Sequence, residues 1–339
     1  MLFFNCGFDR INKSWGPLMP IHTTKSASIL RLVTLSFSLF VAALAFAADG
    51  VRVGAWNMRW FPSGYPITDS SKRDPQREYK RIDSAARFIA REKVDILCME
   101  EMRDRRTCEM LVTNDALNGF MVNACSEFTA APEATVPAHQ NAIISRFKEI
   151  DSGYREWSYS RKYKVHPPRG FVYAVFDISG SLVGVIGIHL KSNYIPKDDS
   201  NAANAPKINR TMREESSRQL LKFTKELMAK DYDGRKVETI MIAGDFNTSI
   251  FDKNYDKETT ITALKKKGFK DCFEGVPERN TMPGSKYYPA TCFDYLFIKG
   301  SSEFFAPVVS KKQYTSDHKM ISVVVRPQDN KTSKNKKEK

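Results

Sequence analysis

The sequence predicts an α/β protein in which buried strands alternate with amphipathic helices. Several short segments, such as VDILCM at 94–99, are almost entirely apolar, as expected for strands that are buried on both faces. Segments with apolar residues at helical spacing lie between them, so strands and helices alternate along the chain. With 339 residues, of which 42% are hydrophobic, the chain is long enough for one large domain.

The first half of the domain is predicted to contain three strands and two helices. Residues 51–58 alternate between apolar and other residues, which indicates a strand. Residues 76–93 carry apolar side chains on one helical face, and 94–101 are a buried strand. Residues 108–117 are predicted to form a short helix, and the apolar segment 141–147 another strand.

The second half begins with a predicted hairpin. Residues 171–190 contain two apolar segments joined at Ser179-Gly180-Ser181, which is typical of two strands and a tight turn. The remaining predicted elements are a long helix at 210–230, a buried strand at 237–247, a short helix and turn at 260–273, and strands at 291–300 and 319–327.

The N-terminal segment has the pattern of a secretory signal peptide. Lys25 and Arg31 precede an apolar run at 32–44, and the small residues Ala45 and Ala47 mark the expected cleavage site. The apolar run is short for a membrane span, although an uncleaved anchor stays open as the alternative. We therefore expect a secreted or periplasmic protein, cleaved near Ala47, with no stable membrane association afterwards.

These features divide the chain into three parts. Residues 1–47 are the N-terminal extension and signal peptide, in which either Met1 or Met19 is the start. Residues 48–326 are the predicted α/β domain. Residues 327–339 are basic and lack the apolar residues that a core would bury, so we expect a disordered tail.

Polar side chains recur where the predicted strands begin or end. Ligands of α/β proteins gather at strand ends, and acids, amides and imidazoles are suited to binding a divalent metal and a phosphate. Any one of these residues alone is more often a turn or capping residue, so the inference depends on the whole set. The set is Asn57, Glu100, Glu101, His189, Asp245, Asn247, Asp294, Asp317 and His318.

The order of the motifs adds a resemblance to a known family. Along the chain follow WNM, DILCMEEMRD, NAIISR, GIHLKSN, GDFN, DYLF and SDH. In this order they resemble the endonuclease/exonuclease/phosphatase superfamily, the deoxyribonuclease-I-like fold, over residues 51–326. The resemblance implies a four-layer α/β sandwich with two central mixed β-sheets flanked by helices. It also implies metal-dependent hydrolysis of phosphoester bonds.

The resemblance also implies roles for individual residues. Mg²⁺ is the expected metal, with Mn²⁺ and Ca²⁺ as alternatives, and which histidine acts as acid or base stays open. Arg169 is a basic residue near the expected site, and we include it among the substrate-binding residues. With Arg169 added, the predicted set is catalytic His189, Asp245, Asp294 and His318; metal-binding Glu101, Asn57 and Asp317; and substrate-binding Asn57, Asn141, Asn247 and Arg169.

Glu100 departs from the family pattern, which often has glutamine before the metal-binding glutamate. Adjacent side chains of a regular strand point to opposite faces. We therefore expect Glu101 alone to face the metal, unless a bulge or a second metal changes the geometry.

The charge of the chain favours nucleic acid as the substrate. The net charge is +14, and basic residues flank the expected site; cations that contact phosphates supply affinity that does not depend on base sequence. We therefore expect an endonuclease acting on DNA, with RNA as a further substrate. The alternatives are a phosphoesterase for lipids or small phosphoesters, of the sphingomyelinase or inositol-phosphate phosphatase type, and a non-catalytic binding module. We also expect a monomer, because the sequence has no heptad repeat.

Export would permit disulfides. By proximity in the sequence we pair Cys108 with Cys125 and Cys272 with Cys292, although four cysteines allow three connectivities. Cys98 lies within an apolar strand, and we expect it to be a buried thiol.

Overall fold

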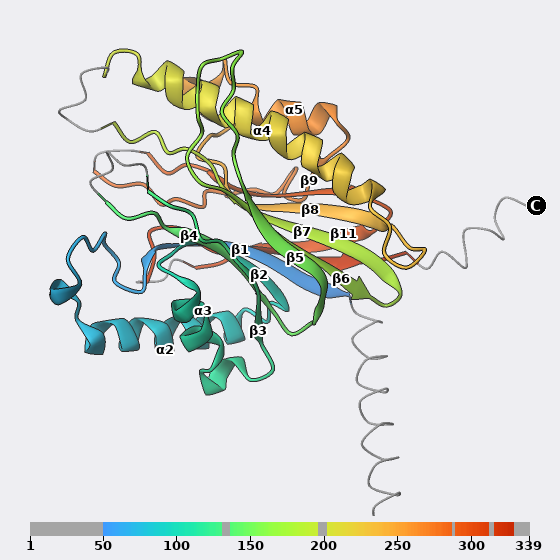
Figure 1. Cartoon of the computed structure of the whole chain (residues 1–339), viewed down its shortest axis with the longest axis horizontal. Coiled ribbons are helices and arrows are strands. Elements are labelled where there is room, and N and C mark those ends of the chain that lie inside the picture. The colour runs from blue at the N-terminus through green and yellow to red at the C-terminus, as the bar shows by residue number, and fades with distance from the viewer. Residues whose placement is uncertain (1–49, 131–135, 196–201, 287–288, 312–314, 329–339) are drawn as a thin grey trace, which may run out of the picture. The chain divides into compact units, whose positions relative to one another are not determined.

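Two β-sheets packed face to face form the centre of the domain, and helices cover both outer faces (Figure 1). The computed structural model describes residues 50–130, 136–195, 202–286, 289–311 and 315–328, all within the unit Ala47–Lys339. Each sheet has six strands, and the predicted four-layer α/β sandwich is confirmed.

The two sheets have similar internal pairing. The first has the order β11 (Glu303–Val309), β12 (Ile321–Arg326), β1 (Val51–Phe61), β2 (Ile96–Met102), β4 (Gln140–Ser145) and β3 (Met121–Cys125). The second has the order β5 (Glu149–Glu156), β6 (Gly170–Ile178), β7 (Ser181–His189), β8 (Val237–Asp245), β10 (Asp294–Gly300) and β9 (Lys270–Asp271). In each sheet one central pair, β1–β2 or β7–β8, is parallel and the other pairs are antiparallel, so both sheets are mixed.

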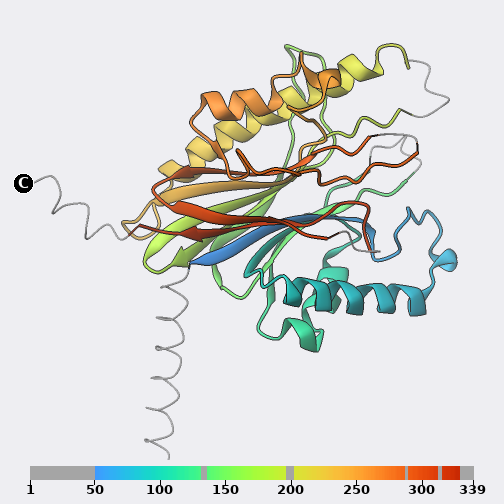
Figure 2. The ribbon, with the colours of Figure 1, turned by 180° about the vertical axis from the view of Figure 1, so that it is seen from behind.

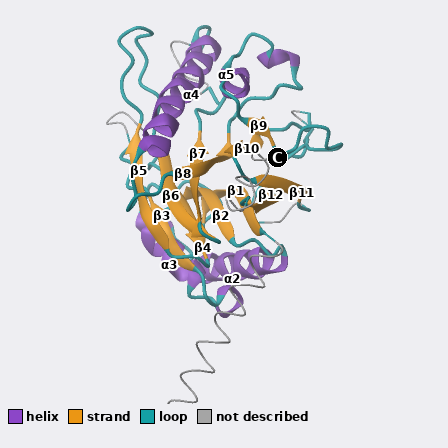
Figure 3. Cartoon of the chain, turned by 90° about the vertical axis from the view of Figure 1, so that its right-hand side faces the viewer, coloured by secondary structure: helices purple, strands orange, loops and turns teal. Residues whose placement is uncertain are grey.

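Each parallel pair is connected through a helix, because parallel neighbours need a long crossover. Helix α2 (Pro75–Arg91) joins β1 to β2, and α4 (Ala205–Ala229) joins β7 to β8. The shorter helices α3 (Arg105–Val112) and α5 (Thr260–Lys266) lie beside them on the two outer faces (Figures 2 and 3). The described residues also form 3₁₀ turns at Ser70–Lys72, Asp115–Leu117 and Lys253–Tyr255.

Alternating side chains of the strands supply three apolar clusters. In β1, Val53 and Ala55 belong to the cluster shared by the two sheets, whereas Trp56 and Met58 belong to the cluster beneath α2 and α3. A third cluster joins the second sheet to α4 and α5. Strands buried on both faces have few polar residues, and this explains the apolar segments of the sequence.

Local sequence explains where several elements begin and turn. Asp74 caps α2 by accepting a hydrogen bond from the backbone nitrogen of Arg77, and Pro75 follows at the first helical position. The predicted hairpin is formed by β6 and β7, and Ser179 and Gly180 both have positive φ, as a type I′ turn requires. The long helix begins at Ala205, five residues before the predicted start at 210.

The cysteines differ from the expectation. The five described cysteines are free in the structure, so neither predicted disulfide is formed. Cys272 packs in the cluster between the sheets and Cys292 in the cluster beneath α4, on opposite faces of the second sheet. Cys108 and Cys125 do meet, as neighbouring thiols, and their contact together with burial raises the pKa of Cys108.

No helix in the part of the chain that the structure describes is long and apolar enough to cross a membrane. The predicted signal peptide lies outside the described residues, as does the predicted tail from residue 329 onward.

Candidate active site

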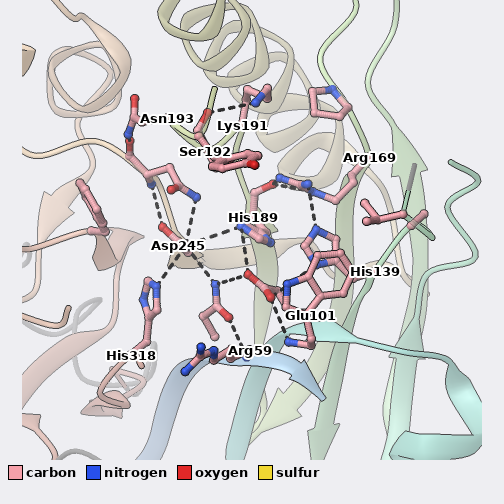
Figure 4. A pocket seen from close by; sticks show the side chains of 18 of the residues that line it. Arg59, Glu101, His139, Arg169, His189, Lys191, Ser192, Asn193, Asp245 and His318 are labelled. Atoms are coloured by element: carbon pink, nitrogen blue, oxygen red, sulfur yellow. Dashed lines mark hydrogen bonds and ion pairs between the residues drawn. The ribbon is translucent and has the colours of Figure 1, made fainter. Parts of the chain in front are cut away.

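The polar residues predicted from the sequence meet where the parallel strands end. In the first sheet, β1 carries Asn57 and β2 carries Glu101; in the second, β7 carries His189 and β8 carries Asp245. These four residues line one cleft of about 1560 Å³ (Figure 4). Because the strands of each pair are parallel, their carboxyl ends lie at the same edge of the sheet.

Sheet register places three of the residues in one row. Asp245 on β8 is paired with His189 on β7 and with Asp294 on β10. Residues paired directly across neighbouring strands have Cβ atoms about 4.5–5.5 Å apart. The row therefore follows from backbone pairing rather than from flexible loops.

Strand β8 ends within the GDFN motif, at Asp245. Gly244 has a φ of +135°, and a Cβ there would clash with the carbonyl oxygen of Ile188. Only glycine fits this position without displacing the neighbouring strand. Asp245 then accepts hydrogen bonds from the backbone nitrogen of Asn247 (2.8 Å) and from the amide nitrogens of Asn247 (3.0 Å) and Asn57 (3.1 Å).

His318 enters the cleft from the loop before β12. Its Nδ1 lies 2.8 Å from Asp294 Oδ2, and its Nε2 lies 3.8 Å from Asp245 Oδ2. Burial alone would lower the pKa of His318, but these two carboxylates outweigh it and raise the pKa well above its usual value. His318 is therefore an imidazolium whose Nε2 faces the cleft. Burial also raises the pKa of Asp245, although the nearby His318 opposes that rise.

Glu101 reaches the cleft because β2 is irregular at this residue. Glu101 has a φ of +60°, and the pairing of β2 with β1 and with β4 shifts register around it. Its Oε1 accepts from Asn57 Nδ2 (3.0 Å) and its Oε2 from the backbone nitrogen of Trp60 (2.9 Å). Burial works to raise the pKa of Glu101, but His139, His189 and Asn57 hold it well below its usual range, so the group is a carboxylate at neutral pH.

Glu100 lies beneath the cleft rather than on its wall. Its side chain is fully buried, and neither carboxyl oxygen has a hydrogen-bond partner among the described residues. Burial, with Asp294 and Asp245 nearby, raises the pKa of Glu100 well above its usual value. Glu100 is therefore a neutral acid, and Glu101 is the one of the pair that lines the cleft.

His139 is a residue of the cleft that the sequence analysis missed. It immediately precedes β4 and stacks on Trp60, with ring centroids 4.6 Å apart. Its Nε2 lies 3.0 Å from Arg169 Nη1 and its Nδ1 lies 3.6 Å from Glu101 Oε2. Arginine can only donate, so Nε2 accepts and the proton of the neutral ring is on Nδ1, facing Glu101. His139 thus links Arg169 to Glu101.

Arg169 holds the end of β7 in place. Its guanidinium donates to the carbonyl oxygens of His189 (3.2 Å) and Leu190 (2.8 Å) as well as to His139. Burial lowers the pKa of Arg169 to about 10, so the group remains charged at neutral pH. Burial and Arg169 together lower the pKa of His189 well below its usual value, so His189 is an uncharged imidazole.

Solved structures show which known fold this arrangement has. An endonuclease/exonuclease/phosphatase family protein from Leptotrichia buccalis superposes with a TM-score of 0.55 at 13% sequence identity, over 81% of this chain and 99% of that chain. The endonuclease/exonuclease/phosphatase from Bacteroides vulgatus gives 0.56 at 14% identity, over 82% and 99%.

The chain has the endonuclease/exonuclease/phosphatase fold.

A third solved structure with this fold is D. rerio TDP2 complexed with a single-strand DNA product, with a TM-score of 0.51 at 16% identity over 82% of this chain and 99% of that chain. No protein-family model matches the chain, and no curated protein matches it in sequence. At these identities the comparison concerns the fold, and the chemistry has to be argued from the cleft itself.

Within the endonuclease/exonuclease/phosphatase fold, the cleft has the ligand chemistry that a hard divalent cation needs. Mg²⁺ is commonly held by one or two carboxylates and several waters. Glu101 is ionised and lies on the cleft wall, and Asp317 lines the same cleft. Glu101, His139 and His189 each offer a ligand atom, and these atoms all lie within 4.8 Å of one another. The residues present therefore fit a divalent cation near Glu101.

Two predicted ligands have other partners in the structure. The amide oxygen of Asn57 accepts from the backbone nitrogen of Arg59 (3.0 Å), and its amide nitrogen faces the two carboxylates, so Asn57 separates Glu101 from Asp245 instead of offering an oxygen. Asp317 lies 3.5 Å from Arg59 Nε and is about one-third exposed.

Two predicted substrate-binding residues also have structural contacts. Asn247 lines the cleft, but its amide nitrogen donates to Leu190 O (3.2 Å) and to Asp245. Asn141 does not line the cleft: it is buried, and its amide nitrogen faces the carbonyl oxygen of Gly170 at 3.4 Å. Asn141 therefore joins the two sheets behind the site.

Proposed function

We propose that the protein is an exported, metal-dependent phosphodiesterase that hydrolyses DNA or RNA. The observation that carries the proposal is the row of Asp294, Asp245 and His189 facing Glu101 across the cleft, with His318 held against Asp294. An ion-pair network that only stabilises the fold does not need an open cleft. It also does not need a charged imidazole, His318, and an uncharged one, His189, in the same cleft.

Two features support nucleic acid as the substrate. The chain carries a net charge of +14, of which residues 1–47 contribute +3 (four Lys/Arg against one acid), so the exported part keeps +11, which favours a polyanion. The D. rerio TDP2 structure with the same fold is a complex with a single-strand DNA product. The N-terminal pattern of basic, apolar and small residues supports export.

The cleft residues divide the chemistry between them. Glu101 would hold a divalent cation, which would neutralise charge on the phosphate and polarise a phosphoryl oxygen. His318 carries a proton at Nε2 and gives it to the leaving oxygen. Asp245 and the uncharged His189, whose Nε2 lies 3.6 Å from Asp245 Oδ2, orient the attacking water and accept its proton. Arg169 adds positive charge beside the phosphate.

The first prediction concerns the reaction itself. Residues 48–339 are expected to nick supercoiled plasmid with Mg²⁺ or Mn²⁺ but not with EDTA. His318→Ala is expected to reduce the rate by about 10²–10⁴-fold, the usual contribution of one general acid or base, with an unchanged circular dichroism spectrum. If the folded protein does not nick plasmid in the presence of either metal, the nuclease proposal is contradicted. Sphingomyelin and inositol phosphates would then be tested as substrates.

The choice of leaving group tests the division of roles. A p-nitrophenolate leaves without protonation, so His318→Ala is expected to lose far less activity on bis(p-nitrophenyl) phosphate than on DNA. His189→Ala is expected to lose similar activity on both substrates, because both need an activated water. Equal losses for His318→Ala on the two substrates would exclude His318 as the acid.

A further inference from the structure

The segment between β5 and β6 forms a projecting hairpin, which we call the β5–β6 arm and define as residues 158–168. It rises beside α4 (Figures 1 and 3). The backbone nitrogen of Ser160 donates to Val165 O (2.8 Å), which closes the hairpin, and a turn connects them. None of the proposed catalytic residues lies on the arm.

The arm is held firmly at its base. The side-chain amide of Gln219 on α4 both donates to and accepts from the backbone of Ser158, at 2.8 Å each. Trp157, just before the arm, is buried against Phe171, with ring centroids 5.1 Å apart. A surface that is already ordered loses little conformational entropy when a partner binds.

The tip of the arm combines positive charge with aromatic rings. Arg161, Lys162 and Lys164 are exposed, and none of the three is paired with a carboxylate among the described residues. Tyr159 is 56% exposed and Tyr163 is 46% exposed. The segment 157–170 itself contains no acidic residue, and the nearby Glu215 on α4 is paired with Arg218.

The arm also continues directly into the cleft. His166, Pro167 and Pro168 at its base line the cleft, and Arg169 follows them. Glu156 also lines the cleft, but a chain of phosphates that leaves the catalytic residues past Arg169 follows residues 164–169, which include no acid, toward Lys164 and Arg161. A small phosphoester held in the cleft would not extend that far.

We propose that the tip of the β5–β6 arm, residues 159–164, is a binding surface for single-stranded nucleic acid outside the catalytic cleft, with its cations on phosphates and its two tyrosines stacked on bases. The inference deepens the proposed nuclease function and rests on it for the identity of the substrate. Single-strand binding surfaces commonly combine a cationic track with aromatic rings on which bases stack. The exposed residues of the tip include no Leu, Ile, Phe or Trp, the side chains that anchor a protein in a bilayer.

Binding can be measured without catalysis. Full-length mature protein in EDTA would be titrated into a fluorescein-labelled 20-nucleotide DNA, with anisotropy as the readout. The triple variant Arg161→Gln, Lys162→Gln, Lys164→Gln is expected to bind at least tenfold more weakly at 100 mM salt. The slope of log K against log salt is expected to fall by about 0.7 for each lost phosphate contact. The matched control is Lys265→Gln, Lys266→Gln, Lys267→Gln at the end of α5, outside the cleft lining.

The tyrosines are tested in the same assay. Tyr163→Ser is expected to weaken binding by about tenfold, in the range of one lost base stack. Tyr79→Ser on α2 is the control, because Tyr79 is even more exposed at 64% and lies on a different helix. Equal effects of the arm variants and their controls would overturn the proposal.

Kinetics separate this proposal from the nuclease proposal. On DNA the triple variant is expected to have a raised KM and an unchanged kcat, whereas hydrolysis of bis(p-nitrophenyl) phosphate, which occupies the cleft alone, is expected to stay within twofold. Arm-dependent binding without hydrolysis of any substrate would support the arm and overturn the nuclease function. Normal DNA binding by the triple variant, with lost binding to phosphatidylglycerol vesicles, would overturn the arm proposal in favour of a membrane contact.

Discussion

Asn57 separates two carboxylates that face the same cleft. Its amide nitrogen donates to Glu101 and to Asp245, and its amide oxygen accepts from the backbone of Arg59. An aspartate there would add a third negative charge and remove both donated hydrogen bonds. The sequence indicated that Asn57 belongs to the site, but its role as a spacer depends on hydrogen bonds that only the folded chain reveals.

His139 shows a different limit of the sequence at the scale of single residues. It stands just before β4 in a segment without a recognisable motif, and its importance comes from contacts with Arg169, Trp60 and Glu101. Glu101 was expected to face the cleft and does, but the irregularity of β2 that directs it there could not be predicted. Motif order identified the acids and His318, whereas the partners that orient them come from distant segments.

We predict that His139 tunes the metal site through Glu101. His139→Ala is expected to raise the metal concentration for half-maximal activity by about 10–100-fold, the usual cost of losing a group that orients a ligand, while kcat at saturating metal falls much less. Mn²⁺ binding followed by electron paramagnetic resonance should show the same shift. Trp60→Phe, which keeps an aromatic ring against position 139, is the control. An unchanged Mn²⁺ affinity in His139→Ala would refute this role.

At the scale of elements, burial determined which strands could be predicted. The four strands that the sequence analysis did not identify are β3, β5, β9 and β11, and these are the edge strands of the two sheets. β5 and β11 are largely exposed or half-buried, so their sequences lack an apolar face. Central strands are buried on both sides and leave a clear signal, whereas an edge strand is defined by the neighbour that it pairs with.

Gly244 is predicted to be essential for the junction of β8 with the site. Gly244→Ala combines a φ of +135° with a clash against the carbonyl oxygen of Ile188, so we expect a loss of about 3 kcal/mol or more in the free energy of unfolding. Gly180→Ala is the matched control: its φ is also positive, but a Cβ there meets nothing within 4 Å, and we expect a loss of about 1 kcal/mol. Urea denaturation measures both, and equal losses would contradict the clash.

Glu78, in the first turn of α2, pairs with two arginines, and its pKa predicts how the stability of the protein depends on pH. Its buried carboxylate lies 2.6 Å from Arg73 Nη2 and 2.7 Å from Arg103 Nη1. Burial opposes ionisation, but these hydrogen bonds hold the pKa of Glu78 below its usual value. Glu78→Gln is therefore expected to lower the free energy of unfolding by about 2 kcal/mol at pH 7.

The sign of the pH dependence follows from that lowered pKa. The stabilisation is complete above the ordinary pKa of glutamate, about 4.3, and is lost as pH falls through the lower pKa of the folded protein. The difference between wild type and Glu78→Gln should therefore shrink below about pH 4. Glu109→Gln, which removes an exposed pair with Arg105, is the control and should cost less than about 0.5 kcal/mol. A difference that grows on acidification would contradict this assignment.

For the whole molecule, the site depends on how the two sheets meet. The first sheet supplies Asn57 and Glu101, the second supplies His189 and Asp245, and the cleft contains them all. Local sequence predicts that each strand ends in a polar residue, but not that two separate sheets bring these ends together. The resemblance in motif order supplied that knowledge, and the solved structures with the same fold agree with it.

The site is completed by the last part of the domain to be synthesised. β12 lies between β11 and β1 in the first sheet, and His318, just before it, follows every other residue of the site in the chain. A ribosome therefore finishes the acids, His189 and Arg169 before it adds the imidazolium and the strand that completes the sheet. Under the proposed function, a growing chain has no competent site. Release of the complete chain from the ribosome is therefore the earliest point at which the proposed activity could begin.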